Sequence, residues 1–200
     1  RFGRSASAPL APDVQRAFER RFEVVIIETM GMTETAAQLL SNPLPPGIRK
    51  VGSPGRAYGN EVMIADGNQL EQERGVEGEV LIRGDNVMTG YLNNPEATAD
   101  AMTADGWLRS GDLGWMDDDG YVTITGRLKE LIIKGGENIA PREVDEALYS
   151  NPSVIEAAAF AVPCSQYGER VEAAVVLKAK ATCDEEELLE LCRSVLGLFK

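Results

Sequence analysis

Carboxylate and hydroxyl side chains lie close to glycines at two places in this 200-residue sequence. Asp112 follows Gly111 beside an apolar run, so its carboxylate could accept charge-assisted hydrogen bonds from a ribose diol while the glycine lets the sugar approach the backbone. Thr33 offers a hydroxyl to a phosphate, and Glu34 offers the hard oxygen that Mg²⁺ prefers. The plainer alternatives are a turn cap for Asp112 and a helix capping box for Thr33 and Glu34. Helix starts also bind anions, so Thr33 and Glu34 could serve both purposes.

The segment around Thr33 and Glu34 has the pattern of a strand, a turn and a helix start. Residues 24–27 form a continuous apolar run that predicts a strand buried on both faces. Gly31 lies in the turn that follows, and the small and apolar residues of 36–40 predict the start of a helix. Ligands bind outside the carboxyl ends of strands in α/β sheets, so we expect this turn to form a ledge for a ligand.

The whole chain is predicted to be α+β, in two domains. Residues 1–128 are expected to form the end of a large α/β domain with an antiparallel or barrel-like β region, with helices at 12–22 and 95–102 and strands at 61–64, 78–82, 113–116 and 121–125. Residues 129–200 are expected to form a small, truncated α+β domain, with strands at 131–133, 154–162 and 171–177, a loop at 135–136, and helices at 141–149 and 184–196.

Composition narrows the classes of function. The net charge of −12 argues against sequence-independent nucleic-acid binding and against an anionic membrane surface as partner, because both need clustered Lys and Arg. No apolar run approaches the roughly 20 residues that span a bilayer. The absence of histidine excludes His-based triads and zinc sites from these residues, and three widely spaced cysteines favour free thiols in the reducing cytoplasm. The chain starts at Arg1 without a methionine, and its last predicted helix runs almost to Lys200, so we expect both ends to be cuts.

Four stretches, in order and spacing, resemble the adenylate-forming superfamily of acyl-CoA synthetases, luciferases and adenylation domains of peptide synthetases. They are Ser5-Ala6-Ser7-Ala8-Pro9-Leu10, Met30-Gly31-Met32-Thr33-Glu34, Gly106-Trp107-Leu108-Arg109-Ser110-Gly111-Asp112, and Gly126-Arg127-Leu128-Lys129-Glu130-Leu131-Ile132 with Gly135-Gly136-Glu137-Asn138-Ile139. The resemblance covers essentially the whole chain. It implies a place in the C-terminal half of such an enzyme.

The resemblance also implies roles for the residues in these stretches. Asp112 and Arg127 would bind the ribose of ATP or AMP, where a surface ion pair is the plain alternative for Arg127. Met30 and Gly31 would lie at the adenine, although the family usually has tyrosine where Met30 stands, which puts adenine affinity and discrimination in question. The catalytic residues would be Thr33 at the α-phosphate, Glu34 as ligand of Mg²⁺, and Lys129 as the hinge between two half-reactions.

Gly135, Gly136 and Asn138 would line the tunnel for the pantetheine of coenzyme A, where a tight turn is the plain alternative for the glycine pair. The family's Ser/Thr/Gly-rich phosphate loop and its Pro-Lys-Thr…Gly-Lys motif with the catalytic lysine are absent from these 200 residues. We therefore expect the chain alone to be inactive.

The activity implied by the resemblance is that of an ATP-dependent acid–CoA ligase, which activates a carboxylate as acyl-AMP and transfers it to CoA. A carrier-protein-loading adenylation domain and an inactive nucleotide-binding fragment stay open as alternatives. The partners would be a small-molecule carboxylate, ATP and CoA, and the resemblance is compatible with a homo-oligomer. Ser41-Asn42-Pro43-Leu44-Pro45 and Arg4-Ser5-Ala6-Ser7 resemble oxalate–CoA ligases more than long-chain enzymes, which suggests oxalate or another short acid.

Overall fold

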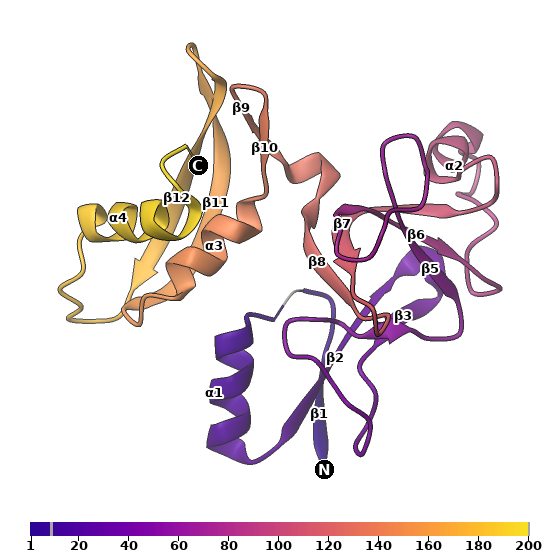
Figure 1. Cartoon of the computed structure of the whole chain (residues 1–200), viewed down its shortest axis with the longest axis horizontal. Coiled ribbons are helices and arrows are strands. Elements are labelled where there is room, and N and C mark those ends of the chain that lie inside the picture. The colour runs from indigo at the N-terminus through magenta and orange to yellow at the C-terminus, as the bar shows by residue number, and fades with distance from the viewer. Residues whose placement is uncertain (9, 200) are drawn as a thin grey trace. The chain divides into compact units, whose positions relative to one another are not determined.

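The computed structural model describes residues 1–8 and 10–199, and Figure 1 follows their course. The chain forms two compact units, Arg1–Ile124 and Thr125–Lys200. Both contain helices and strands, which confirms the predicted α+β class. Among the described residues, no helix combines the length and apolarity that crossing a bilayer requires.

Helix α1 (Pro12–Phe22) has the bounds that the sequence predicts. Proline stands in its first turn, and Glu23 ends it in the left-handed conformation with a bond to the carbonyl of Glu19. Gln15 is its buried residue, at 2% exposure, and its side chain donates to the carbonyl of Ile26 at 3.3 Å.

The first sheet has the order β1-β2-β3-β4. Its strands are β1 (Phe2–Ser5), β2 (Val25–Met32), β3 (Ala37–Ser41) and β4 (Arg56–Ala57). β1 runs parallel to β2, whereas β3 pairs antiparallel with both β2 and β4.

The predicted helix start after Glu34 is wrong. Thr33–Thr35 form a single 3-10 turn (η1), and Ala36 has a φ of 51°, which breaks any helical continuation. β3 follows as a strand, and two consecutive residues within it, Leu39 and Leu40, are both fully buried. Successive strand residues point to opposite faces, so this apolar pair marks a strand that is covered on both sides.

The connection between β3 and β4 is organised by Asn42, which is 3% exposed. Its amide nitrogen donates to the carbonyls of Ser53 at 2.5 Å and Lys50 at 3.5 Å, and its amide oxygen accepts from the Lys50 backbone at 2.9 Å. One side chain thus supplies much of the hydrogen bonding that regular structure would otherwise give this loop.

The second sheet has the order β5-β6-β7-β8 and supplies most of the core of the first unit. Its strands are β5 (Glu61–Ala65), β6 (Gly78–Arg83), β7 (Leu108–Met116) and β8 (Val122–Arg127), and the short helix α2 (Pro95–Ala101) precedes β7. β6 pairs antiparallel with both β5 and β7, in agreement with the predicted antiparallel region. The four predicted strands all correspond to observed ones, but β7 begins five residues before the predicted start at 113.

The second unit has a sheet of order β10-β9-β12-β11, with helices packed against it (Figure 1). Its elements are the 3-10 turn η2 (Leu128–Glu130), β9 (Ile132–Lys134), β10 (Glu137–Ile139), α3 (Pro141–Tyr149), β11 (Val154–Cys164), β12 (Gly168–Leu177) and α4 (Glu185–Leu196). Val144 and Leu148 of α3 and Leu188 of α4 are buried in one cluster with Ile132 and Ile139. The helices match their predicted ranges, whereas β10 is not anticipated by the sequence.

Candidate functional site

The turn at Thr33–Thr35 is built around the hydroxyl of Thr35, which is 1% exposed. This hydroxyl donates to the carbonyl of Met32 at 3.1 Å and accepts from the Met32 backbone N–H at 3.3 Å. The capping function considered for Thr33 and Glu34 therefore belongs to Thr35. Thr33 is exposed and Glu34 half-buried, so both side chains stand at the surface of the turn.

Glu34 is held by a segment far away in the sequence. The phenol of Tyr91 donates to its Oε1 at 2.8 Å, and the backbone N–H of Met88 donates to its carbonyl at 2.7 Å. Asn86 adds a bond from its amide to the carbonyl of Thr35 at 3.2 Å. The bond to Glu34, partial burial and the negative carboxylate all raise the pKa of Tyr91, so this phenol stays a donor.

Glu34 is the carboxylate at this turn that could hold a magnesium ion. Among the residues that the structure describes, no three His, Cys, Asp or Glu side chains gather into a metal cluster. Mg²⁺ bound to nucleotides usually takes only one or two protein carboxylates and completes its shell with phosphates and water. A single carboxylate anchored through one oxygen suits that mode.

Met30 and Gly31 lie where β2 approaches this turn. Met30 is half-buried and packs against the core cluster of the first unit, while Gly31 is exposed. The pairing of β2 with β3 shifts register between these two residues. The turn at which the sequence predicts a ledge for a ligand is the end of a β-hairpin and not the start of a helix.

Asp112 lies inside β7 and is 4% exposed. Asp112 therefore does not cap a turn but belongs to a strand. Gly111 has a φ of 72°, and a Cβ added there would meet nothing within 4 Å. The backbone N–H of Asp112 donates to the hydroxyl of Ser110 at 3.0 Å. A glycine with open space before a buried carboxylate leaves room for a ligand to approach the backbone.

The structure brings the Met30–Glu34 segment and the strand of Asp112 around one core. Met30 and Met32 pack against the cluster that contains Leu108 and Met116, the two ends of β7. The sequence predicts Asp112, Thr33 and Glu34 as site residues, but it gives no signal for Tyr91, whose partner lies 57 residues earlier.

The remaining predicted residues belong to the second unit. Arg127 and Lys129 are exposed, at the end of β8 and within η2. Gly135 and Gly136 form the two-residue turn between β9 and β10, with φ values of 60° and 89°. Such turns need positive φ at both positions, so the tight-turn explanation suffices for this pair. The first unit therefore contains Met30, Thr33, Glu34 and Asp112, and the second contains Arg127, Lys129 and the glycine pair.

Two family models match parts of the chain. Residues 1–92 match the family described as AMP-binding enzyme, and residues 143–200 match the AMP-binding enzyme C-terminal domain. The chain is 53% identical over 200 residues to a sulfoacetate–CoA ligase of Cupriavidus necator and 44% identical over 201 residues to an oxalate–CoA ligase of Saccharomyces cerevisiae. All of this chain is covered in both alignments, but only 39% and 37% of the relatives.

Solved structures lead to the same family. ATP-bound MatB from Rhodopseudomonas palustris superposes with a TM-score of 0.94 at 38% identity, over 100% of this chain and 40% of that one. The chain thus spans about two fifths of the length of its relatives. The motifs, the fold and both family matches show that the chain belongs to the AMP-binding, adenylate-forming enzyme family.

Proposed function

We propose that this chain is the ribose-, metal- and hinge-bearing part of an AMP-forming acid–CoA ligase. The observation that supports this most is the buried Asp112 behind an open Gly111, on a strand that shares its core with the Thr33–Glu34 turn. The whole enzyme would activate a carboxylate with ATP and pass the acyl group to CoA in the cytoplasm, where the three free cysteines would stay reduced.

The chemistry has two steps. A carboxylate oxygen of the acid attacks the α-phosphorus of ATP, the bond to the bridging oxygen breaks, and pyrophosphate leaves from the acyl-AMP. The deprotonated thiol of CoA then attacks the acyl carbon, and AMP leaves with the bonding electrons as the thioester forms. In the first step Thr33 would donate a hydrogen bond to an α-phosphate oxygen, and Asp112 and Arg127 would hold the ribose.

Met30 and Gly31 would border the adenine, with the methionine packing on the ring through its polarizable sulfur. Glu34 would hold Mg²⁺, which neutralises phosphate charge when bound. Residues 129–200 would form the mobile small domain and residues 1–128 the C-terminal part of the large AMP-binding domain. Gly135, Gly136 and Asn138 of the small domain would border the pantetheine of CoA.

For the acid, we propose a short molecule with a second anionic group. The relatives named above are ligases of sulfoacetate and of oxalate, both of which fit that description. Ser5 and Ser7, in the stretch that resembles the acyl-pocket segment, add hydroxyls, whereas Pro9 of the same stretch lies outside the described residues. A panel of oxalate, sulfoacetate, malonate, octanoate and palmitate, scored by pyrophosphate release from the full-length ligase, tests this. Preference for octanoate or palmitate would contradict it.

The activity itself is tested by Asp112→Ala in the full-length ligase. Loss of charge-assisted bonds to the ribose, of about 1.5–3 kcal/mol, should lower kcat/KM for ATP roughly ten- to a hundredfold. Asp118→Asn is the matched control, because Asp118 is an exposed carboxylate in the turn after the same strand. Unchanged ATP kinetics in Asp112→Ala would remove the ribose role, and wild-type protein that releases no AMP with any acid would refute the ligase proposal.

A further inference from the structure

β7 has a bulge at Asp112. The register pairs Glu79 of β6 with Leu113 and Leu81 with Arg109. Between these pairs β6 has one residue, Val80, whereas β7 has three, residues 110–112. Bulges break the ladder, turn side chains to new directions and recur beside active sites. The backbone groups of this bulge lose regular ladder partners, so other groups must satisfy them.

The carboxylate of Glu79 supplies a large part of that bonding. Its Oε1 accepts from the backbone N–H of Gly111 at 3.2 Å, and its Oε2 accepts from Nε of Arg109 at 3.0 Å. Nη2 of Arg109 lies 2.9 Å from the same Oε2. Glu79, on the neighbouring strand, therefore binds β7 at two residues, Gly111 and Arg109. The hydroxyl of Ser110 adds a further bond within the bulge, because it accepts from the N–H of Asp112.

Burial makes this arrangement unusual for a carboxylate. Glu79 is 9% exposed, and acids are rarely buried unless they are paired. Glu61 of the adjacent β5 offers the contrast, because it binds Arg83 through both oxygens but is 62% exposed at its side chain. These bonds come from the side chain of Arg83 and not from β7. A charge-assisted bond that a buried carboxylate accepts from a backbone N–H is stronger and more rigid than such a surface pair.

We infer that Glu79, together with Ser110, is a positioning residue that sets the bulge of β7 and thereby aims Asp112 at the ribose of the nucleotide. This inference rests on the proposed function of Asp112. Glu79 itself would not touch the nucleotide. It fixes the backbone at Gly111, whose positive φ gives the bulge its shape.

The test measures ribose recognition as a ratio. In the full-length ligase, kcat/KM is determined for ATP and for 2′-deoxy-ATP in wild type, Asp112→Asn, Glu79→Gln and Glu61→Gln. We expect wild type to prefer ATP, and we expect Glu79→Gln to lose about tenfold or more of that preference, as Asp112→Asn does. Glu61→Gln should keep the wild-type ratio. Amide hydrogen exchange on the 200-residue chain should show faster exchange at Gly111 in Glu79→Gln.

The outcomes separate this inference from the proposed function. A Glu79→Gln enzyme that keeps the wild-type ratio, even with a lower melting temperature, overturns the positioning role. Wild-type enzyme that uses both nucleotides equally removes the ribose role of Asp112 instead. If Glu79→Gln does not fold, Ser110→Ala replaces it, because it removes the bond to the Asp112 N–H and leaves Glu79 in place. A reduced ratio in Ser110→Ala supports the inference, and an unchanged one overturns it.

Discussion

At the scale of single residues, the bond between Tyr91 and Glu34 decides how the proposed metal ligand is presented. The phenol donates to Oε1, so one oxygen of the carboxylate is anchored. Tyr91 is in turn fixed through its backbone, whose N–H donates to the hydroxyl of Thr98 in α2 at 2.9 Å. The helix thereby contributes, through Tyr91, to the order of the Glu34 carboxylate.

Tyr91→Phe should therefore raise the Mg²⁺ concentration that the full-length ligase needs for half-maximal rate. We expect a several-fold increase, because a hydrogen bond to a charged group contributes about 1.5–3 kcal/mol and part of that orients the carboxylate. The apparent KM for the acid should change little. Tyr58→Phe is the control, since Tyr58 is 66% exposed. An unchanged Mg²⁺ requirement in Tyr91→Phe would show that the phenol does not order Glu34.

The raised pKa of Tyr91 adds a dependence on pH. A group whose pKa is higher in the folded state stabilises the fold fully below its unfolded pKa, which is about 10 for tyrosine. That contribution disappears as the pH rises through the folded value. Alkaline titration by ultraviolet absorbance should show a late-ionising tyrosine in wild type that Tyr91→Phe lacks. Identical titration curves would contradict a Tyr91 phenol that donates to the Glu34 carboxylate.

Local residue types were enough to predict Asp112, Thr33 and Glu34 as candidates, because carboxylates and hydroxyls beside glycine have few chemical uses. Tyr91 and Glu79 could not be predicted, since their partners lie 57 and 32 residues away and only the folded strands bring them close. The sequence thus indicates groups that could meet a ligand, but not those that orient them.

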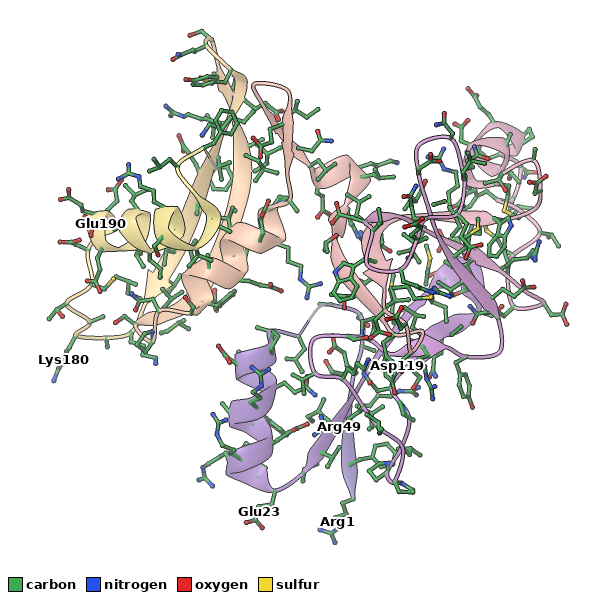
Figure 2. All side chains as sticks on the ribbon, viewed as in Figure 1. Arg1, Glu23, Arg49, Asp119, Lys180 and Glu190 are labelled. Carbon is green, nitrogen blue, oxygen red and sulfur yellow. The ribbon has the colours of Figure 1, made fainter. Side chains whose placement is uncertain are left out.

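At the scale of elements, α1 is tied to the first sheet through Glu19. Its Oε1 accepts from the backbone N–H of Ile26 at 2.8 Å, and its Oε2 accepts from Arg49 at 2.8 Å (Figure 2 labels Arg49). Burial raises the pKa of Glu19, but the bonds from the Ile26 backbone, Arg49 and Gln15 outweigh it, so the net shift is downward. The carboxylate therefore stabilises the fold only while it is charged.

Glu19→Gln should lower the free energy of unfolding at neutral pH by about 1–3 kcal/mol. A group with a depressed folded pKa contributes above its unfolded value, about 4.3 for glutamate, and that contribution is lost as the pH falls through the folded value. The difference in free energy of unfolding between mutant and wild type should therefore become smaller in acid. Urea titrations at neutral and acidic pH measure it, with Glu23→Gln, an exposed neighbour at the end of α1, as control. A difference that is independent of pH would contradict the charge-based explanation.

Helices were easier to predict than strands. α1, α2 and α3 begin with a proline in the first turn, and α4 begins after Asp184, whose carboxylate accepts from the N–H of Glu187 at 3.0 Å. The predicted helix start at β3 is wrong because small and apolar residues after a turn fit both periods. β10 has three residues, two of them polar and exposed, and only its pairing with β9 makes it a strand.

At the scale of the whole molecule, η2 (Leu128–Glu130) follows the boundary between the two compact units along the chain. If Lys129 is the hinge, its φ and ψ must differ between the two half-reactions. Lys129→Pro fixes φ near −65° and restricts Leu128 as well. We expect it to spare pyrophosphate exchange, which reports adenylation, and to reduce acyl-CoA formation.

Lys129→Ala is the matched control, because it removes the charge but leaves the backbone free. It should affect both half-reactions little. An equal loss of both steps in Lys129→Pro, together with a lower melting temperature, would indicate damage to the fold. If neither step falls, Lys129 is not the hinge.

The 200-residue chain alone should form no acyl-CoA from ATP, Mg²⁺, CoA and any acid in the panel. It lacks the Ser/Thr/Gly-rich phosphate loop and the motif with the catalytic lysine, and it spans about two fifths of the length of its relatives. Thioester formation is followed by mass spectrometry, with the full-length ligase as positive control. Turnover by the purified chain would show that neither motif is required.

The loop that Asn42 organises has a consequence for proteolysis. Arg49 and Lys50 are targets for trypsin in a stretch without regular secondary structure, where cleavage would ordinarily concentrate. The backbone N–H of Lys50, however, is bound by Asn42. The side chain of Arg49 is paired with Glu19, and that of Lys50 with Asp117. A protease must bend its substrate into an extended form, which here requires these bonds to break together. Cleavage at this loop should therefore report unfolding of the first unit and not the local mobility of a connection.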